Sequence, residues 1–212
     1  MTCTFPDISI STDRLVLRPL EEEDLASFTE MMNDEQVAVW TAIPTPYDED
    51  HAREWITKIA PAERAEGRGV VFAVTEFLTG RLVGSVHLKH TDWHLRSTEA
   101  DYVVAPWARG EGYASESVLA VAQWLFQSQG FERLEFRTAA DNFAAQQVAQ
   151  RIGGISEGVL RNAWIARMRT EQGRWTEMRT DLIVWSLLPE DLEGVPERMT
   201  EAGGHAPYAD WN

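Results

Sequence analysis

The stretch VVAPWARGEGYASES (Val103–Ser117) carries the strongest structural signal in this 212-residue sequence. An apolar run that ends at Pro106 is followed by Gly110 and Gly112, and then by apolar residues at helical spacing. This order predicts a strand, a glycine loop and a helix whose N-terminus can bind an anion through backbone N–H groups. The loop lacks the lysine of a nucleotide P-loop and the third glycine of a dinucleotide fingerprint. Taken alone, the stretch also fits a plain strand-to-helix turn.

The composition limits the classes of partner. The chain has 34 Asp and Glu against 19 Lys and Arg, for a formal net charge of -15. This excess argues against nucleic acid, because phosphate recognition depends on basic patches. It attracts cations such as amines, although it also serves solubility alone. Cys3 is the single cysteine, so an internal disulfide and a thiolate metal cluster are excluded. With no apolar run of about 18 residues and no signal peptide, we expect a cytoplasmic protein without membrane contact.

The hydrophobic pattern predicts the element order β-α-α-β-β-β-α-β-α-β-β in one mixed α/β domain. The length suits one filled core, so we expect a single domain at 1–188 and a polar, Pro- and Gly-rich tail at 189–212. The predicted strands lie within 9–20, 70–77, 81–88, 97–106, 133–140, 158–168 and 176–188, and the predicted helices within 21–34, 49–65, 113–129 and 142–154.

The segment Arg109–Ala114 fits the pattern [R/Q]-x-x-G-x-[G/A]. It resembles the pyrophosphate loop of the GNAT superfamily of N-acetyltransferases. Further segments resemble the RimJ/RimL-like branch of that superfamily in order, over about residues 9–188: TDRLVLRPLEEEDL, LVGSVHL, EADYVVAPWARGEGYASES, DNFAAQQVAQRIGG, EGVLR and TDLIVWSLL. The resemblance implies a mixed, mostly antiparallel central sheet with flanking helices. It also implies a cofactor cleft where the fourth and fifth strands of the family's sheet splay apart, here next to Arg137–Asp141.

The resemblance implies acyl-CoA, most simply acetyl-CoA, as co-substrate, and we expect no metal. Backbone amides rather than basic side chains would hold the pyrophosphate, so an acidic protein can bind it. Glu111 departs from the basic residue that is usual in the family at this position. Asn142 also suits a helix cap. The implied cofactor-binding residues are Val103, Val104, Arg109, Gly110, Glu111, Gly112, Tyr113, Ala114, Asn142 and Ala145.

The implied reaction is direct attack of a primary amine on a thioester, which requires that the ammonium first lose a proton. Glu99 and Asp101 share one face of a predicted strand, and two close carboxylates raise one pKa toward neutrality. The alternative is that both are solvated edge charges. His87 is the next candidate, with a structural role as its alternative. His87, His90 and His94 lack the spacing of a defined metal-ligand set.

Two departures from the family affect the chemistry. Ala145 stands where the branch carries a serine that is proposed to protonate the leaving thiolate, and Gly154 replaces a usual aromatic residue. Three alternatives are compatible with the missing serine hydroxyl: another donor such as a tyrosine protonates the thiolate, the reaction proceeds without acid assistance, or the protein binds acyl-CoA with little turnover.

Aromatic residues lie in segments that surround the acceptor in the family. Trp40, Trp93 and Trp107, together with Tyr47 and Trp55, are candidates for an acceptor wall that suits cationic or bulky substrates. Core packing is the alternative for most of them. We therefore expect an N-acyltransferase for a protein or peptide N-terminus or a small amine, acting alone or as a homodimer. The alternatives are a non-catalytic acyl-CoA sensor and a transferase that uses another acyl-CoA such as succinyl-CoA.

Overall fold

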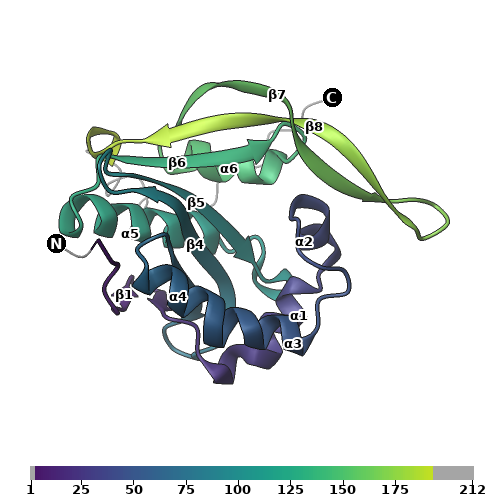
Figure 1. Ribbon diagram of the computed structural model, residues 1–212, viewed down its shortest axis with the longest axis horizontal. Coiled ribbons are helices and arrows are strands. Elements are labelled where there is room, and N and C mark those ends of the chain that lie inside the picture. Colours follow the sequence, from purple (N-terminus) through teal and green to yellow (C-terminus); the bar gives the residue numbers. More distant parts are fainter. Residues whose placement is uncertain (1–2, 193–212) are drawn as a thin grey trace, which may run out of the picture.

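The computed structural model of the protein describes residues 3–192. Within these residues, an eight-stranded sheet runs in the order β1-β2-β3-β4-β5-β6-β8-β7 (Figure 1). Neighbouring strands are antiparallel except β5 and β6, which are parallel. The strands are β1 (Ile10–Ser11), β2 (Leu15–Arg18), β3 (Val70–Glu76), β4 (Leu82–Asp92), β5 (Ser97–Val104), β6 (Arg133–Ala139), β7 (Ile155–Arg169) and β8 (Trp175–Leu187). The predicted mixed, mostly antiparallel sheet is confirmed.

Helices cover both faces of the sheet. They are η1 (Glu22–Asp24), α1 (Leu25–Met32), α2 (Glu35–Trp40), α3 (Glu49–Glu54), the π-helical turn η2 (Trp55–Ile59), α4 (Ala60–Ala65), η3 (Pro106–Ala108), α5 (Tyr113–Ser128), α6 (Phe143–Arg151) and η4 (Pro189–Leu192). Phe72 and Tyr102 both align with Val86 in the strand register. Phe72 packs against Trp124 of α5, and Tyr102 reaches α6. His87 lies on the opposite face, where Glu63 of α4 contacts it.

Helix α5 is held by its apolar side. Val118, Val121 and Leu125 recur at helical spacing and are fully buried against the sheet. The helix ends just before Gly130, whose φ of 69° lies in the left-handed region that glycine tolerates. The predicted helix and its glycine stop are therefore both present.

Two helical details differ from the prediction. A separate helix, α2, forms after the helix predicted at 21–34, where no helix is predicted. It begins there because the Asp34 side chain accepts hydrogen bonds from the N–H groups of Gln36 and Val37. The helix predicted at 49–65 is interrupted by η2, whose π turn separates α3 from α4. The hydrophobic pattern does not distinguish one added residue in a helical turn from a regular helix.

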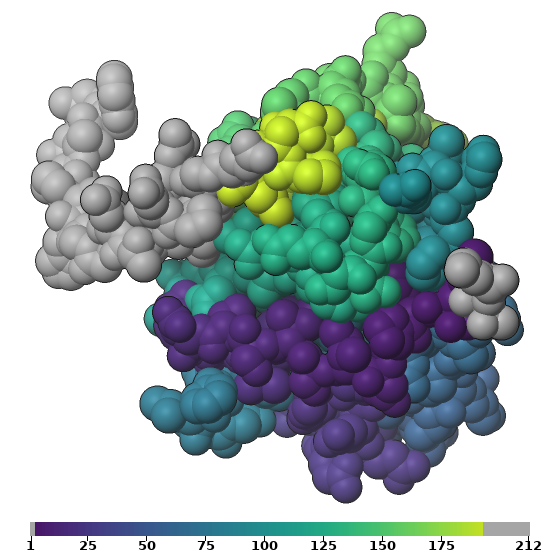
Figure 2. Space-filling view, turned by 90° about the vertical axis from the view of Figure 1, so that its left-hand side faces the viewer, coloured from purple at the N-terminus to yellow at the C-terminus, as the bar shows by residue number. Residues whose placement is uncertain are grey.

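Strands β7 and β8 extend past the body of the molecule as a two-stranded arm (Figure 1). At the other end, the N-terminal segment runs across the face beside α5, as the purple and teal-green atoms in Figure 2 show. A groove of about 490 Å³ lies there between residues 8–13 and α5. In the described chain each helix is too short or too polar to span a bilayer. Of the predicted tail, Pro189–Leu192 form η4 and the rest lies outside the described residues.

Candidate functional site

The parallel strands β5 and β6 separate along their length. Only Ser97–Glu99 pair with Arg133–Glu135. Beyond that point β5 continues beside β4 as far as Val104, whereas β6 continues beside β8 as far as Ala139. The edge of β5 at Val103 and Val104 consequently has no strand partner on the side toward β6. The predicted splay is present, and it leaves backbone groups that can bind an extended ligand chain.

The glycine loop leads from this opening to the N-terminus of α5. Gly110 and Gly112 have φ values of 86° and 79°, a region that side-chain-bearing residues rarely adopt. Gly112 is the N-cap residue of α5 and provides no side-chain cap, so the first N–H groups of the helix lack that partner. An anion is the ligand that such an end binds best.

Ser115 supports the same interpretation. Its side chain is 1% exposed, and its Oγ is the only buried side-chain polar atom in the described residues that lacks a hydrogen-bond partner. Burying an unpaired hydroxyl costs about 1–3 kcal/mol. Ser115 lies in the first turn of α5, directly after the glycine loop. A phosphate oxygen bound at this helix end would satisfy it, so the residues present fit a pyrophosphate.

The positive charge near the loop comes from residues that the loop sequence does not contain. Arg14 donates to the carbonyl oxygen of Glu111 (3.1 Å) and to the Glu116 carboxylate (2.8 Å from Nε). A Cβ at Gly112 would lie 3.8 Å from Arg14 Nη2 and 4.0 Å from Arg151 Nη1. Glu111 therefore contributes its backbone carbonyl to the bond that holds the loop. Sequence reasoning missed both arginines, since both lie far from the loop in the sequence.

Arg109, predicted to bind the cofactor, is engaged elsewhere. Its guanidinium pairs with the carboxylate of Asp34, the cap of α2. Burial raises the pKa of Asp34, but the Arg109 hydrogen bond and charge outweigh it and the net pKa is lowered. Tyr113 is likewise held, since its hydroxyl donates to Glu76 (3.1 Å) and Arg14 lies over its ring. Ala114 follows in the first turn of α5.

The start of α6 borders the opening on its other side. Asn142 Oδ1 accepts a hydrogen bond from the Ala145 N–H (3.1 Å), so the predicted helix cap is present. The Tyr102 hydroxyl, from β5, donates to the carbonyl oxygen of Ala145 at 3.4 Å. A phenol thus lies beside the position that lacks the expected serine hydroxyl.

A charged cluster occupies the opposite face of β4, β5 and β6. The Glu99 carboxylate, 6% exposed, lies 3.2 Å from Lys89 Nζ, 3.1 Å from His90 Nδ1 and 3.5 Å from Arg137 Nε. Lys89 also pairs with Asp101. Burial raises the pKa of Glu99, but the charge of Lys89 and the bond from His90 outweigh it, so the net pKa is lowered. The expectation that the carboxylate pair raises this pKa is wrong, because Lys89 lies between the two carboxylates.

His87 lies on the same face and has a partner that sequence reasoning missed. Its Nε2 is 2.9 Å from Oε2 of Glu63 on α4. His90, in contrast, contacts Glu99 through its Nδ1 (3.1 Å). Among the described residues, no three acidic, histidine or cysteine side chains cluster in a way that could hold a metal ion.

The three candidate tryptophans are not brought together. Trp93 lies in the turn before β5, where its indole N–H donates to the carbonyl of Gly67 (2.8 Å) and its ring packs on Phe5 and Phe131. This is the closed end of the splay, and Trp93 is partly buried there against the core. The Trp107 indole donates to the Leu82 carbonyl (2.9 Å). Trp40, half-buried at the end of α2, remains as a candidate.

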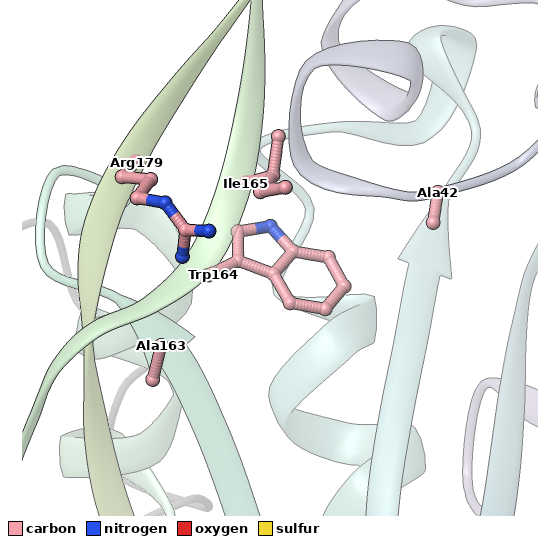
Figure 3. A pocket seen from close by; sticks show the side chains of 5 residues that line it. All are labelled: Ala42, Ala163, Trp164, Ile165 and Arg179. Carbon is pink, nitrogen blue, oxygen red and sulfur yellow. The ribbon is translucent and has the colours of Figure 1, made fainter.

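A hollow of about 330 Å³ lies between the arm and the chain that follows α2, lined by Ala42, Ala163, Trp164, Ile165 and Arg179. Figure 3 shows the Trp164 indole reaching from β7 into the space between the arm and Ala42. Arg167 fixes the two sides by donating to the Ile43 carbonyl (2.7 Å) and the Thr45 hydroxyl (3.0 Å). This hollow could not be predicted from local sequence patterns, because its walls come from distant segments.

Known proteins resemble this chain in sequence and in fold. A family model described as the acetyltransferase (GNAT) domain matches residues 14–155. The chain is 26% identical to the uncharacterized N-acetyltransferase YoaA of Bacillus subtilis over 152 residues, which are 72% of this chain and 85% of the relative. It is 26% identical to spermidine N(1)-acetyltransferase of Vibrio cholerae over 148 residues, 69% of this chain and 82% of that protein.

Among solved structures, Mycobacterium smegmatis RimJ in complex with CoA-disulfide superposes with a TM-score of 0.77 at 20% identity, covering 93% of this chain and 95% of RimJ. That likeness shows the same fold. Because the family model spans well over half of the sequence and the splayed sheet and glycine loop are both present, the chain belongs to the GNAT acetyltransferase family, whose activity is N-acetyl transfer to amines.

Proposed function

We propose that this chain transfers an acetyl group from acetyl-CoA to a primary amine. The observation that supports it best is the opening between β5 and β6, which leads to the uncapped N-terminus of α5 and the unpartnered Ser115 hydroxyl. The RimJ structure with CoA-disulfide has the same fold. A thioester supplies an activated acyl group, so the chain has to bind it, orient it and manage two protons.

The loop amides, the Ser115 hydroxyl and the Arg14 and Arg151 guanidiniums would bind the pyrophosphate. The free backbone edge of β5 at Val103 and Val104 would bind the pantetheine chain. In this arrangement Arg109 acts indirectly, because its bond to Asp34 ties α2 to the loop.

Two protons must leave the attacking ammonium nitrogen. A C–N bond forms and the C–S bond breaks, and the electron pair of that bond goes to sulfur. One amine proton goes to a base on the face of the sheet that α4 covers. Sulfur gains a proton from a donor, and the second amine proton, lost as the amide forms, restores that donor. The Tyr102 hydroxyl is our candidate donor, because it lies next to Ala145 where the family's serine is missing. Glu99 and Asp101 would form ion pairs with Lys89, whose charge offsets theirs, and would not accept the proton.

The hollow beside Trp164 and the end of α2 would receive the acceptor. Its apolar lining suits the stem of an amine, and the net charge of -15 attracts its cationic form. A protein or peptide N-terminus is the acceptor class we propose first, and a small amine second. The relative named spermidine N(1)-acetyltransferase supports the second class.

Ser115→Ala tests the cofactor site. Loss of a hydroxyl bond to a phosphate should weaken CoA binding by about 10-fold or more. Because Ser115 Oγ has no partner in the free protein, the variant should keep or slightly gain thermal stability. Ser117→Ala is the matched control, since its hydroxyl donates to the Ala114 carbonyl one turn away. That control should lose about 1 kcal/mol of stability and keep its CoA affinity. Equal calorimetric CoA affinity in Ser115→Ala and the unaltered protein would contradict the assignment.

A second candidate function is a non-catalytic acyl-CoA sensor. The observation that favours it is Ala145, which removes the hydroxyl expected beside the sulfur. Acyl-CoA binding without acyl transfer to any amine would identify it. Acyl donors other than acetyl-CoA, such as succinyl-CoA, belong in the same measurement.

A further inference from the structure

Glu63 and His87 form a carboxylate–imidazole pair that the assigned roles do not use. The 2.9 Å contact joins Glu63 Oε2 on α4 to His87 Nε2 on β4. Their side chains are 19% and 20% exposed, so the contact is mostly shielded from water. Shielding strengthens the interaction between the carboxylate and a charged imidazole.

The π-helical turn η2 precedes the helix that carries Glu63. A π turn is rare, occurs mostly as a single turn within an α-helix, and is frequent at functional sites. Trp55, at the start of η2, packs edge-on against the His87 ring, with centroids 5.4 Å apart and planes at 81°. Glu63 follows in α4 and reaches the same ring. One irregular helical segment therefore supplies both contacts that fix the imidazole.

The contact with Glu63 decides which ring nitrogen carries the proton. A carboxylate only accepts hydrogen bonds, so Nε2 must carry the hydrogen and Nδ1 keeps its lone pair. Within residues 3–192, Nδ1 has no hydrogen-bond partner, and it is not among the buried atoms without one. Nδ1 is therefore left without a partner among these residues and is not completely buried.

Three charged groups face the imidazole from the elements packed around it: Glu63 of α4, Asp101 of β5 and Lys89 of β4. Burial lowers the pKa of His87, Lys89 lowers it further, and Glu63 and Asp101 only partly offset this. The lowered pKa favours the neutral form of the ring. A neutral imidazole can accept a proton, in contrast to the Glu99 carboxylate, which is held by Lys89, His90 and Arg137.

We propose that His87 accepts the amine proton at Nδ1, directly or through one water, and that Glu63 is its positioning residue. This inference rests on the proposed acetyl transfer. His87 is aligned with Asp101, which lies beyond the point where β5 leaves β6, so one strand, β5, separates the ring from the open part of the splay. The proton leaves the ammonium nitrogen for the Nδ1 lone pair, the amine becomes neutral, and the imidazolium is balanced by Glu63. The proton then passes to solvent.

Nitrogen-15 NMR of histidine in the free protein tests the pair without any turnover. We expect the Nε2–H form of His87 in the unaltered protein. In Glu63→Gln, the pKa of His87 should fall further, because the carboxylate that stabilises the imidazolium is gone. Glu54→Gln changes an exposed glutamate of α3 and should leave the His87 signals unchanged. An Nδ1–H form, or an unchanged His87 pKa in Glu63→Gln, would overturn the assignment of Glu63.

Steady-state rates test the role of the base. His87→Gln should lose about 100-fold in kcat/KM at pH 7, and less at alkaline pH where the amine is already neutral. Glu63→Gln should lose about 10-fold, with the acidic limb of its pH profile moved to lower pH. Glu54→Gln should match the unaltered protein. A purely structural Glu63 would lower the rate without moving that limb, which would refute its positioning role.

The two levels of the proposal fail differently. If the unaltered protein acetylates an amine and His87→Gln keeps its rate and pH profile, the base assignment is wrong while the proposed function stands. If the unaltered protein acetylates no amine, the proposed function is wrong and the base assignment falls with it.

Discussion

Tyr102 and Ala145 approach each other where β5 faces the start of α6, and this contact bears on how the leaving sulfur gains a proton. The 3.4 Å separation is long for a bond between a hydroxyl and a carbonyl oxygen, so the phenol is only weakly engaged. Burial, with a smaller effect of Asp101, raises the pKa of Tyr102 above its ordinary value. The hydroxyl therefore stays protonated at physiological pH and can donate to a thiolate.

Removing that hydroxyl should slow the chemical step. In Tyr102→Phe we expect kcat to fall by about 100-fold, with CoA affinity within about threefold of the unaltered protein. The double variant Tyr102→Phe, Ala145→Ser places a hydroxyl on the other side of the same contact and should recover about 10-fold of that loss. A Tyr102→Phe enzyme with unaltered kcat across the pH range would exclude Tyr102 as the donor.

At the scale of elements, the charges around Glu99 connect three strands. Glu99 on β5 contacts Lys89 on β4 and Arg137 on β6, next to the point where β5 and β6 separate. The ion pair with Lys89 joins β5 to β4, and the ion pair with Arg137 joins β5 to β6 where the hydrogen bonding between those two strands ends. The cluster thus stabilises the closed end of the splay and leaves the opening beyond it unpaired.

The lowered pKa of Glu99 has a defined effect on stability. A carboxyl group whose pKa is lower in the folded state stabilises the fold fully above its unfolded pKa, about 4.3, and loses that stabilisation as the pH falls through its folded pKa. Glu99→Gln should therefore lose about 1–3 kcal/mol at pH 7 and show a shallower loss of stability below about pH 4.3. Glu66→Gln, which alters an exposed pair with Arg68, should change stability by less than about 0.5 kcal/mol. Urea denaturation across this pH range measures both, and parallel stability curves for Glu99→Gln and the unaltered protein would refute the effect.

Local chemistry predicted most elements. Gly112 and Gly130 lie at the start and end of α5 because only glycine adopts those backbone angles without strain, and Asn142 caps α6. What failed depended on contacts between distant segments. The surroundings of Trp93 could not be predicted, because its contacts include Gly67 and Phe131, which lie far from it in the sequence.

The same limit applies to the candidate site. The splay and the loop could be predicted from Val103–Ser117 and the family resemblance. Arg14 could not, because it lies about a hundred positions before Glu116, its partner. Glu63 could not either, since a π turn sets which face of the helix it occupies. The effect of Lys89 on Glu99 required the strand register, which places the two side by side.

At the scale of the whole molecule, the acidity and the anion site are compatible. The net charge of -15 is carried by the chain at large, while Arg14 and Arg151 lie beside the loop where an anion would bind. Backbone amides and a helix N-terminus bind phosphate without regard to the total charge. The acidity of the chain at large suits the cationic acceptor that we propose.

The central claim is that this chain moves an acetyl group from acetyl-CoA to an amine. The direct measurement is release of CoA thiol, with mass spectrometry of the acceptor, over a panel that contains free-N-terminal peptides and polyamines, with succinyl-CoA as a second donor. We predict thiol release that requires both acetyl-CoA and an amine, together with N-acetylated product. Calorimetric binding of acetyl-CoA without thiol release from any amine in the panel would contradict the claim and identify an acyl-CoA sensor.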